Sequence, residues 1–266
     1  MIEKLKVSLI GCGRLGSAMA KGLLSFDKQF DVVIYDRNPE KLSAIKKLYN
    51  GGNLTIASDI SAAAKSPIVI LLVKPDSLKD TLQQIENELD DDVLIISCAA
   101  SKTISEIKSY LRKNFATARA MPNTALEKLA SYTTFFLNIE DQQKKHVERI
   151  EAIFNPLGKA EMLNEESGFQ MAGAVLGCSP AYLLKVVKAL EEGGIEAGLP
   201  AKTALNYAKG ALLATYKLLE DDTNPSERIK QIASPGGITQ MGLNSLDKDK
   251  FEESLKKALQ ITKTRV

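Results

Sequence analysis

The sequence predicts a doubly wound α/β domain with a mostly parallel sheet, followed by a domain built only of helices. Strand-like and helix-like patterns alternate over residues 1–163, and this alternation is typical of a parallel sheet covered by helices on both faces. Helical patterns separated by Gly and Pro occupy residues 164–266, where no further strand is expected. With 266 residues, the chain is long enough for two ordinary domains.

Short apolar runs predict the strands of the first domain, and the most continuous of them lies at residues 68–73. The expected strands are 7–10, 32–35, 54–57, 68–73, 93–97, 116–121, 132–136 and 160–163. Amphipathic stretches predict the helices between them, at 15–24, 39–48, from Asp59, 77–89, 104–111 and 141–154. Asn38 followed by Pro39 matches the usual chemistry of a helix start.

The second domain is expected to contain helices at 168–192, 201–220, 225–232, 238–246 and 250–262. Pro180 lies inside the first of them, where it either kinks the helix or marks a functional break. The apolar face of this helix is larger than one helix layer easily buries, and it includes Leu183, Leu184, Val186, Val187 and Leu190. We therefore expect a homodimer that associates through the helical half.

The composition argues against several classes of function. The formal net charge is +2, from 35 Lys+Arg and 33 Asp+Glu spread along the chain, so no affinity for nucleic acid or acidic membranes is expected. Cys12, Cys98 and Cys178 are odd in number and far apart, which indicates neither a disulfide framework nor a metal site and fits a reducing, cytoplasmic compartment. The N-terminus does not resemble a signal peptide, and the longest apolar runs are too short to span a bilayer.

The chain contains one histidine, His146. It lies in a predicted helix whose apolar face is marked by Val147 and Ile150, so we expect His146 on the solvent-exposed side. The chemistry is then expected to proceed without a histidine acid or base, which argues against Ser-His-Asp hydrolysis and against histidine-bound metals.

The clearest motif is GxGxxG, formed by Gly11, Cys12, Gly13, Arg14, Leu15 and Gly16. It follows an expected strand and opens an expected helix, which is the context in which this motif binds a dinucleotide. Gly11 allows the tight turn, Gly13 lets the backbone approach a pyrophosphate, and Gly16 lets the helix pack closely on the strand. The alternative is a plain glycine-rich turn.

Asp36 ends the second expected strand, at the position where an acidic residue typically hydrogen-bonds the adenosine ribose hydroxyls and favours NADH. Arg37 follows directly and Lys41 is near, and either side chain is able to hold the 2′-phosphate of NADPH instead. The alternative for Asp36 is a solvated charge or one at a helix N-terminus. The sequence therefore leaves both NADPH and NADH open as the cofactor.

The unusual residues of the first domain all follow expected strands. In an open parallel sheet, ligands bind beyond the carboxyl ends of the strands. The residues concerned are Gly11 to Gly16, Asp36, Arg37, Val73, Lys74, Pro75, the stretch 97–100 with Ala99, Met121, Pro122 and Asn123. A turn explains each group by itself, but their coincidence at one edge of the sheet predicts a cofactor site there.

A glycine-rich loop at residues 234–239 precedes an expected helix of the second domain. Its backbone N–H groups and the hydroxyls of Ser234 and Thr239 are suited to an anion such as a substrate carboxylate. Gly236 and Gly237 provide the exposed backbone. The alternative for this loop is a simple turn between helices.

Over nearly its whole length the chain resembles the pyrroline-5-carboxylate reductase family. The matching segments are 10–16, 73–75, 119–124, 179–182, 192–195 with 198–200, and 234–239, of which the last is the most specific. The resemblance implies a Rossmann-type first domain, an all-helical second domain that dimerises, and assembly of dimers into rings. It also implies NAD(P)H-dependent reduction of 1-pyrroline-5-carboxylate to L-proline, with the cyclic imino acid held by Ser179, Ser234, Gly236, Gly237 and Thr239.

This reaction needs a hydride on carbon and a proton on nitrogen, and an imine that enters protonated is already an electrophile. The protein then mainly orients the nicotinamide and the substrate. Thr239 is the first candidate for a catalytic hydroxyl beside the nitrogen, an ordered water is an alternative, and Tyr182 is a weaker one.

Several positions in the second half depart from the family pattern, namely Gln170, Gly173, Leu176, Cys178, Gly210, Ala211 and Ile238. Because they are expected on the substrate side, one alternative stays open. It is an NAD(P)-binding paralogue with a different imine substrate or a regulatory, non-catalytic role. A β-hydroxyacid dehydrogenase shares the two-domain plan, but that family has a Lys four residues after a Gly in the inter-domain helix, and here Ala172 and Gly177 stand at those positions.

Overall fold

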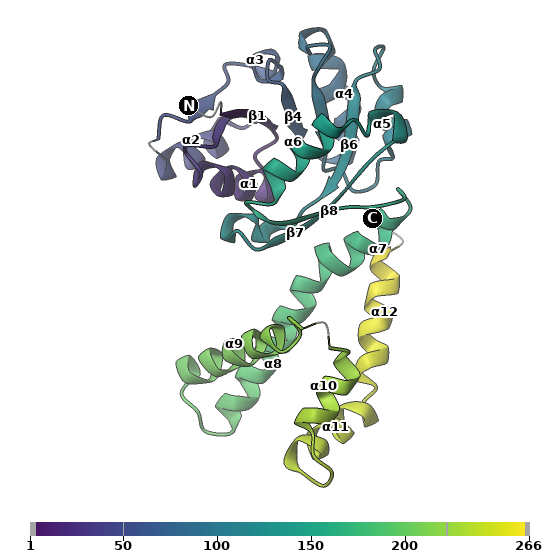
Figure 1. The fold of residues 1–266 in the computed structure, drawn as a ribbon. Helices are drawn as coiled ribbons and strands as arrows, with labels where there is room; N and C mark the ends of the chain where they lie inside the picture. The colour runs from purple at the N-terminus through teal and green to yellow at the C-terminus, as the bar shows by residue number, and fades with distance from the viewer. Residues whose placement is uncertain (1–3, 50, 222, 264–266) are drawn as a thin grey trace. The chain divides into compact units, whose positions relative to one another are not determined.

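The computed structural model describes residues 4–49, 51–221 and 223–263, which form two compact units (Figure 1). The first unit runs through Gly177 and combines a sheet with helices. The second begins at Cys178, and its described residues form helices and no strand. The fold class predicted from the sequence is therefore confirmed, whereas a boundary between functional domains at residues 163 and 164 stays a prediction.

The sheet of the first unit has the strand order β3-β2-β1-β4-β5-β6-β7-β8. Its strands are β1 (Leu5–Ile10), β2 (Phe30–Tyr35), β3 (Leu54–Ile56), β4 (Ile68–Leu71), β5 (Leu94–Ser97), β6 (Ala116–Met121), β7 (Ser131–Leu137) and β8 (Gly158–Met162). Strands β1 to β6 pair in parallel, β7 is antiparallel to β6, and β8 is parallel to β7. The parallel part has the order of a dinucleotide-binding sheet, which reverses direction between β1 and β4.

Helices cover both faces of this sheet. One face carries α1 (Arg14–Leu24), α2 (Pro39–Leu48) and α6 (Lys144–Phe154), and the other carries α3 (Ile60–Ala64), α4 (Pro75–Ile85) and α5 (Ile104–Ser109). Successive strand side chains point to opposite faces, so Ile68 and Ile70 enter one apolar core while Val69 and Leu71 enter the other. This burial on both faces explains the continuous apolar run of β4.

Side-chain caps fix the start of several helices. Asn38 accepts the N–H of Glu40 at 2.9 Å and thereby caps α2, as the sequence predicts. Thr103 and Glu106 form a reciprocal capping box at the start of α5. Short 3-10 helices are present at η1 (Glu86–Glu88), η2 (Thr124–Lys128) and η3 (Ile139–Asp141).

A partly buried ion pair holds the segment that follows β8 in the first unit. Arg119, from β6, approaches Glu166 to 2.9 Å, and its guanidinium lies 4.3 Å from the centre of the Phe169 ring. The same Glu166 oxygen accepts the N–H of Ile104, at 2.7 Å. The start of α7 (Gly168–Ala172) is therefore tied to β6 and to α5.

The second unit consists of α8 (Ser179–Glu196), α9 (Ala201–Lys217), α10 (Pro225–Ile232), α11 (Ile238–Lys248) and α12 (Phe251–Lys263), with α8 and α9 side by side. A π-helical stretch, η4 (Gly173–Cys178), joins α7 to α8. The interruption predicted near Pro180 is therefore a change from π-helix to α-helix, and the chain stays helical through it. Such π-helical turns are frequent at functional sites.

The helix Gly168–Glu196 is long and apolar enough to cross a membrane by length and composition. The expectation that every apolar stretch is too short to do so is therefore wrong for this helix. Its apolar residues are interspersed with small and polar ones, so the segment is apolar on average without containing a long continuous apolar run.

The prediction that His146 lies in solvent is wrong. His146 is buried in α6 with Ile150, Ile153 and Phe154, and its Nδ1 atom has no hydrogen-bond partner. These residues follow the i, i+4, i+7, i+8 spacing of one helix face. His146 lines a small pocket near the residues that precede β5 and β6, which is the sheet edge opposite the carboxyl ends of those strands.

Burial of His146 is expected to make folding sensitive to acid. Desolvation, assisted by Lys145 and Arg149, lowers its pKa below the ordinary value of 6.5. The unfolded chain then binds the proton at higher pH than the folded chain, so the free energy of unfolding falls as the pH drops below 6.5. Urea denaturation between about pH 7 and pH 5 measures this fall, which is expected to be smaller in His146→Leu. Since His146 is the only histidine, equal slopes in both proteins would contradict the prediction.

Candidate functional site

The GxGxxG segment forms a tight turn between β1 and α1. Gly11 has a φ of +107°, and its N–H donates to the carbonyl oxygen of Tyr35 at 2.8 Å. A Cβ at Gly11 would lie 2.8 Å from the carbonyl group of Leu72, and one at Gly16 would lie 1.9 Å from the oxygen of Gly11. The backbone packing therefore requires glycine at both positions, as the motif predicts.

Gly13, in contrast, faces open space. No heavy atom lies within 4 Å of a Cβ built there, and Gly13 is the N-cap of α1 without a side-chain hydrogen bond. The first turn of α1 contains no acidic residue, so its N–H groups and the positive end of the helix dipole are available to an anion. The turn fits the pyrophosphate of a dinucleotide.

Asp36 braces this turn from the end of β2. Its Oδ2 atom accepts the N–H of Cys12 at 2.7 Å, and its Oδ1 atom accepts the N–H of Asn38 at 2.8 Å. Lys41, from α2, forms an ion pair with it at 3.1 Å. Burial by itself raises the pKa of Asp36, but the hydrogen bonds from Asn38, Cys12 and Lys41 outweigh this effect, and the pKa lies below its ordinary value.

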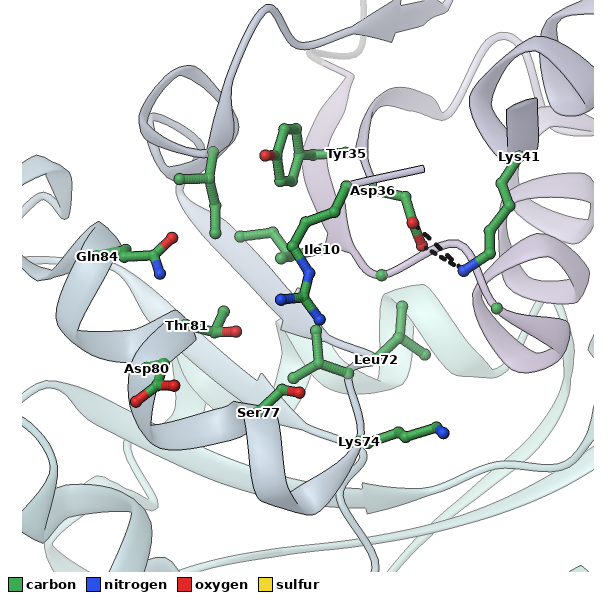
Figure 2. A pocket seen from close by; sticks show the side chains of 15 residues that line it. Ile10, Tyr35, Asp36, Lys41, Leu72, Lys74, Ser77, Asp80, Thr81 and Gln84 are labelled. Carbon is green, nitrogen blue, oxygen red and sulfur yellow. Dashed lines mark hydrogen bonds and ion pairs between the residues drawn. The ribbon is translucent and has the colours of Figure 1, made fainter. Parts of the chain in front are cut away.

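A cleft of about 340 Å³ lies at the carboxyl ends of β1, β2 and β4 (Figure 2). The predicted cofactor residues that line it are Gly11, Gly13, Asp36, Arg37, Val73 and Lys74. Helix α4 supplies a polar wall of Ser77, Asp80, Thr81 and Gln84, across the cleft from Lys41 in the view of Figure 2. No sequence motif marks this wall or Tyr35, so neither is predicted from the sequence.

A second pocket, of about 520 Å³, is lined by Cys12, Gly13 and Arg14 together with Lys41. Gly13 and Lys41 therefore line both hollows. Cys12 itself is buried, and desolvation, with a contribution from Asp36, raises the pKa of its thiol to about 12. The thiol stays protonated, so Cys12 acts here through its backbone and its packing rather than as a nucleophile.

The remaining predicted cofactor residues line neither hollow, namely Leu15, Gly16, Pro75, Ala99, Met121, Pro122 and Asn123. Pro75 begins α4, and Asn123 caps η2 by accepting the N–H of Ala125 at 2.9 Å. Ala99 follows β5, and Met121 ends β6, so both belong to the edge at which β1, β2 and β4 end. Their contact with a cofactor stays a prediction.

The glycine-rich loop of the second unit leads into α11. Gly236 has a φ of +75°, whereas Gly237, the N-cap, has a φ of −75° and no side-chain cap. The N–H of Gly237 donates to the carbonyl oxygen of Ser234 at 3.0 Å, and Ser234 and Thr239 are exposed. The first turn of α11 therefore presents uncapped N–H groups beside two hydroxyls, which suits an anion.

Ser179 begins α8 and is half-buried, and its role as a substrate contact stays a prediction. The described residues contain no group of three or more His, Cys, Asp or Glu side chains that could hold a metal ion.

The helical half matches the family described as pyrroline-5-carboxylate reductase dimerisation over residues 166–266, and residues 6–101 match the family described as NADP oxidoreductase coenzyme F420-dependent. Pyrroline-5-carboxylate reductase 1 of Dictyostelium discoideum is 33% identical over 95% of this chain, which spans about half (48%) of that relative. Pyrroline-5-carboxylate reductase 2 of the same organism is 30% identical, over 95% of this chain and 89% of its own length.

A solved structure extends the likeness to three dimensions. The crystal structure of 1-pyrroline-5-carboxylate reductase from Streptococcus pyogenes aligns with a TM-score of 0.86 and 26% identity, over 98% of both chains. Sequence and fold thus agree along both units, and the chain belongs to the pyrroline-5-carboxylate reductase family.

Proposed function

We propose that this protein reduces the C=N bond of 1-pyrroline-5-carboxylate to L-proline with NAD(P)H, as a step of proline biosynthesis. The observation that carries the proposal is the cleft at the carboxyl ends of β1, β2 and β4, with its glycine turn shaped for a pyrophosphate. This cleft stands in a chain whose helical half matches the reductase family along its length. The match of residues 6–101 to a family described as NADP oxidoreductases supports a nicotinamide dinucleotide as the cofactor.

In this proposal each unit has its own task. The N–H groups at the start of α1 hold the pyrophosphate beside Gly13, and Asp36 keeps the glycine turn in place. The nicotinamide supplies the hydride when it is bound. The uncapped first turn of α11, with Ser234 and Thr239, accepts the substrate carboxylate, and Ser179 adds a polar contact.

The proton reaches the nitrogen from a hydroxyl or a water. His146 is buried in a pocket beside the residues that precede β5 and β6, away from the nucleotide edge, so it is no candidate for this step. Thr239 is exposed in the first turn of α11 and is the hydroxyl that we assign to the nitrogen. The hydride adds to the carbon, the C=N π electrons move to the nitrogen and form its bond to the incoming proton, and the proton donor is reprotonated from solvent water.

A direct assay tests the function. Purified protein is mixed with 1-pyrroline-5-carboxylate and either NADPH or NADH, and both cofactor oxidation and L-proline are measured. We expect stoichiometric oxidation and proline formation. Folded protein that binds the nucleotide but oxidises neither cofactor would instead support a paralogue with another imine substrate or a regulatory role. The observation that favours this alternative is that Leu176 and Cys178 depart from the family pattern.

We further propose that the protein is a cytoplasmic homodimer formed through the second unit, with rings of dimers as the larger assembly that the family resemblance implies. Apolar side chains exposed on this unit support an oligomer over a membrane anchor, because they are distributed over several helices. Examples are Leu184 (67% exposed) on α8, Leu213 (61%) on α9 and Met241 (68%) on α11. Light scattering at micromolar protein is expected to give the mass of a dimer or a multiple of it, and a monomer mass would contradict the proposal.

A further inference from the structure

Lys41 lies at the rim of the nucleotide cleft and forms an ion pair with the Asp36 carboxylate (Figure 2). The Nζ atom of Lys41 lies 3.1 Å from Oδ2 and 3.3 Å from Oδ1. Lys41 lines both the main cleft and the pocket beside Arg14. Its side chain is 44% exposed, whereas that of Asp36 is 11% exposed, so the lysine is the solvent-facing member of the pair.

The hydrogen-bonding capacity of Asp36 is used within the chain. A carboxylate has about four acceptor positions, two on each oxygen. Oδ2 accepts from the N–H of Cys12 and from Lys41, and Oδ1 accepts from the N–H of Asn38 and from Lys41. With Lys41 in place, the carboxylate has no acceptor position left for a ribose hydroxyl.

The charge at this corner of the cleft also differs from that expected of an NADH site. An acidic residue at the end of the second strand repels a 2′-phosphate when it is unpaired. Here Lys41 neutralises Asp36, and the exposed Arg37 adds a positive charge on the same rim. The hydrogen bonds that depress the pKa of Asp36 keep it ionised at neutral pH, so the ion pair with Lys41 persists.

We propose that Lys41 sets the cofactor preference of this enzyme: it withdraws Asp36 from ribose recognition and, together with Arg37, receives the 2′-phosphate of NADPH. Asp36 then serves to brace the glycine turn and the start of α2, and does not select NADH. The inference rests on the nucleotide use stated in the proposed function, and it is independent of the imine substrate.

Binding of nucleotide fragments to Lys41→Met tests this directly. Isothermal titration compares adenosine 2′,5′-bisphosphate with 5′-AMP, and NADPH with NADH. We expect the preference for the 2′-phosphorylated member of each pair to fall by about tenfold to a hundredfold, as for the loss of one charged hydrogen bond. An unchanged preference would overturn the proposal.

Two control variants accompany this measurement. Lys41→Arg retains the positive charge and is expected to keep most of the preference. Lys47→Met removes the same charge from an exposed position of α2 that lines neither pocket, and it is expected to change nothing. If Lys47→Met lowers the preference as much as Lys41→Met, the effect is one of overall charge and the proposal fails.

Asp36→Asn, in the natural chain and in Lys41→Met, separates the two roles of the carboxylate. If Lys41 neutralises Asp36, removal of its charge raises the NADPH-to-NADH affinity ratio more in Lys41→Met than in the natural chain. If Asp36 binds the ribose in the presence of Lys41, the rise is at least as large in the natural chain, and the proposal is wrong.

These binding measurements need no turnover. If the predicted affinities are measured but 1-pyrroline-5-carboxylate is not reduced, the inference about Lys41 holds and the proposed reaction is refuted. If the imine is reduced but the cofactor preference does not depend on Lys41, the proposed reaction holds and the inference about Lys41 is refuted.

Discussion

Thr239→Ala is expected to lower kcat/KM for 1-pyrroline-5-carboxylate by roughly tenfold to a thousandfold, the range seen when one oriented hydrogen-bond donor is lost at a reacting centre. Thr239 is exposed in the first turn of α11, so the substitution leaves the packing of the second unit intact. Nucleotide affinity is expected to stay the same, because the predicted nucleotide residues all lie in the first unit. Steady-state kinetics combined with NADPH titration measures both effects.

Thr203→Ala provides the matched control. Thr203 also lies in the first turn of a helix of the second unit, α9, but outside the glycine-rich loop. Near-native kcat/KM is expected for this control. If Thr239→Ala also keeps near-native kcat/KM, the loop at residues 234–239 is a structural turn, and bound water becomes the source of the proton.

Gly13→Val is expected to weaken binding of NADPH and NADH alike by about a hundredfold or more, since several charged hydrogen bonds to the pyrophosphate are lost together. The folded state is expected to tolerate the change, because a Cβ at Gly13 meets no atom within 4 Å and its φ of −69° is ordinary. The valine side chain is therefore expected to occupy the space in which we expect the pyrophosphate, without changing the conformation of the turn. Nucleotide titration and Tm measured on the same sample separate binding from stability.

Substitutions at two other glycines serve as controls for Gly13→Val. Gly52→Val changes a position that also has open space around it but lies outside both pockets, and it is expected to affect neither binding nor Tm. Gly16→Val is expected to unfold the first unit or lower its Tm strongly, because its Cβ would lie 1.9 Å from the oxygen of Gly11. Normal nucleotide affinity in Gly13→Val would show that the pyrophosphate does not bind at this turn.

Much of the fold was predictable because strands and helices of this sheet have distinct apolar periods. The run at β4 is apolar at every position since both of its faces are buried, and β6 and α2 have the predicted bounds. The antiparallel direction of β7 was not predictable, because alternation within a strand carries no information about its neighbour. Strand β8 begins earlier than expected, at Gly158, whose φ of +143° and close contact with Ser131 are tertiary features.

The candidate site was predictable where a motif carries its own chemistry, and less so elsewhere. The glycine turn and its helix follow directly from the spacing of the three glycines. The expectation for His146 fails because Val147 and Ile150 do not by themselves define the apolar face. The buried face contains His146, Ile150 and Ile153, whereas Val147 is only half-buried. The polar wall of α4 has no sequence motif, and the ion pair of Asp36 with Lys41 joins the end of a strand to a helix. Neither feature is therefore predictable from the sequence alone.

The bracing of the glycine turn has a consequence for the kinetics and the evolution of cofactor binding. The bonds from Gly11 to Tyr35 and from Cys12 to Asp36 are made within the chain, so the binding loop is preorganised before any nucleotide arrives. Binding then loses little loop entropy, and association is expected to follow a single fast phase without a slow ordering step. The braces use backbone N–H groups, whereas the side chain that we propose to bind the 2′-phosphate is exposed on α2. Cofactor preference can therefore drift through exchanges at position 41 while the architecture of the loop is conserved.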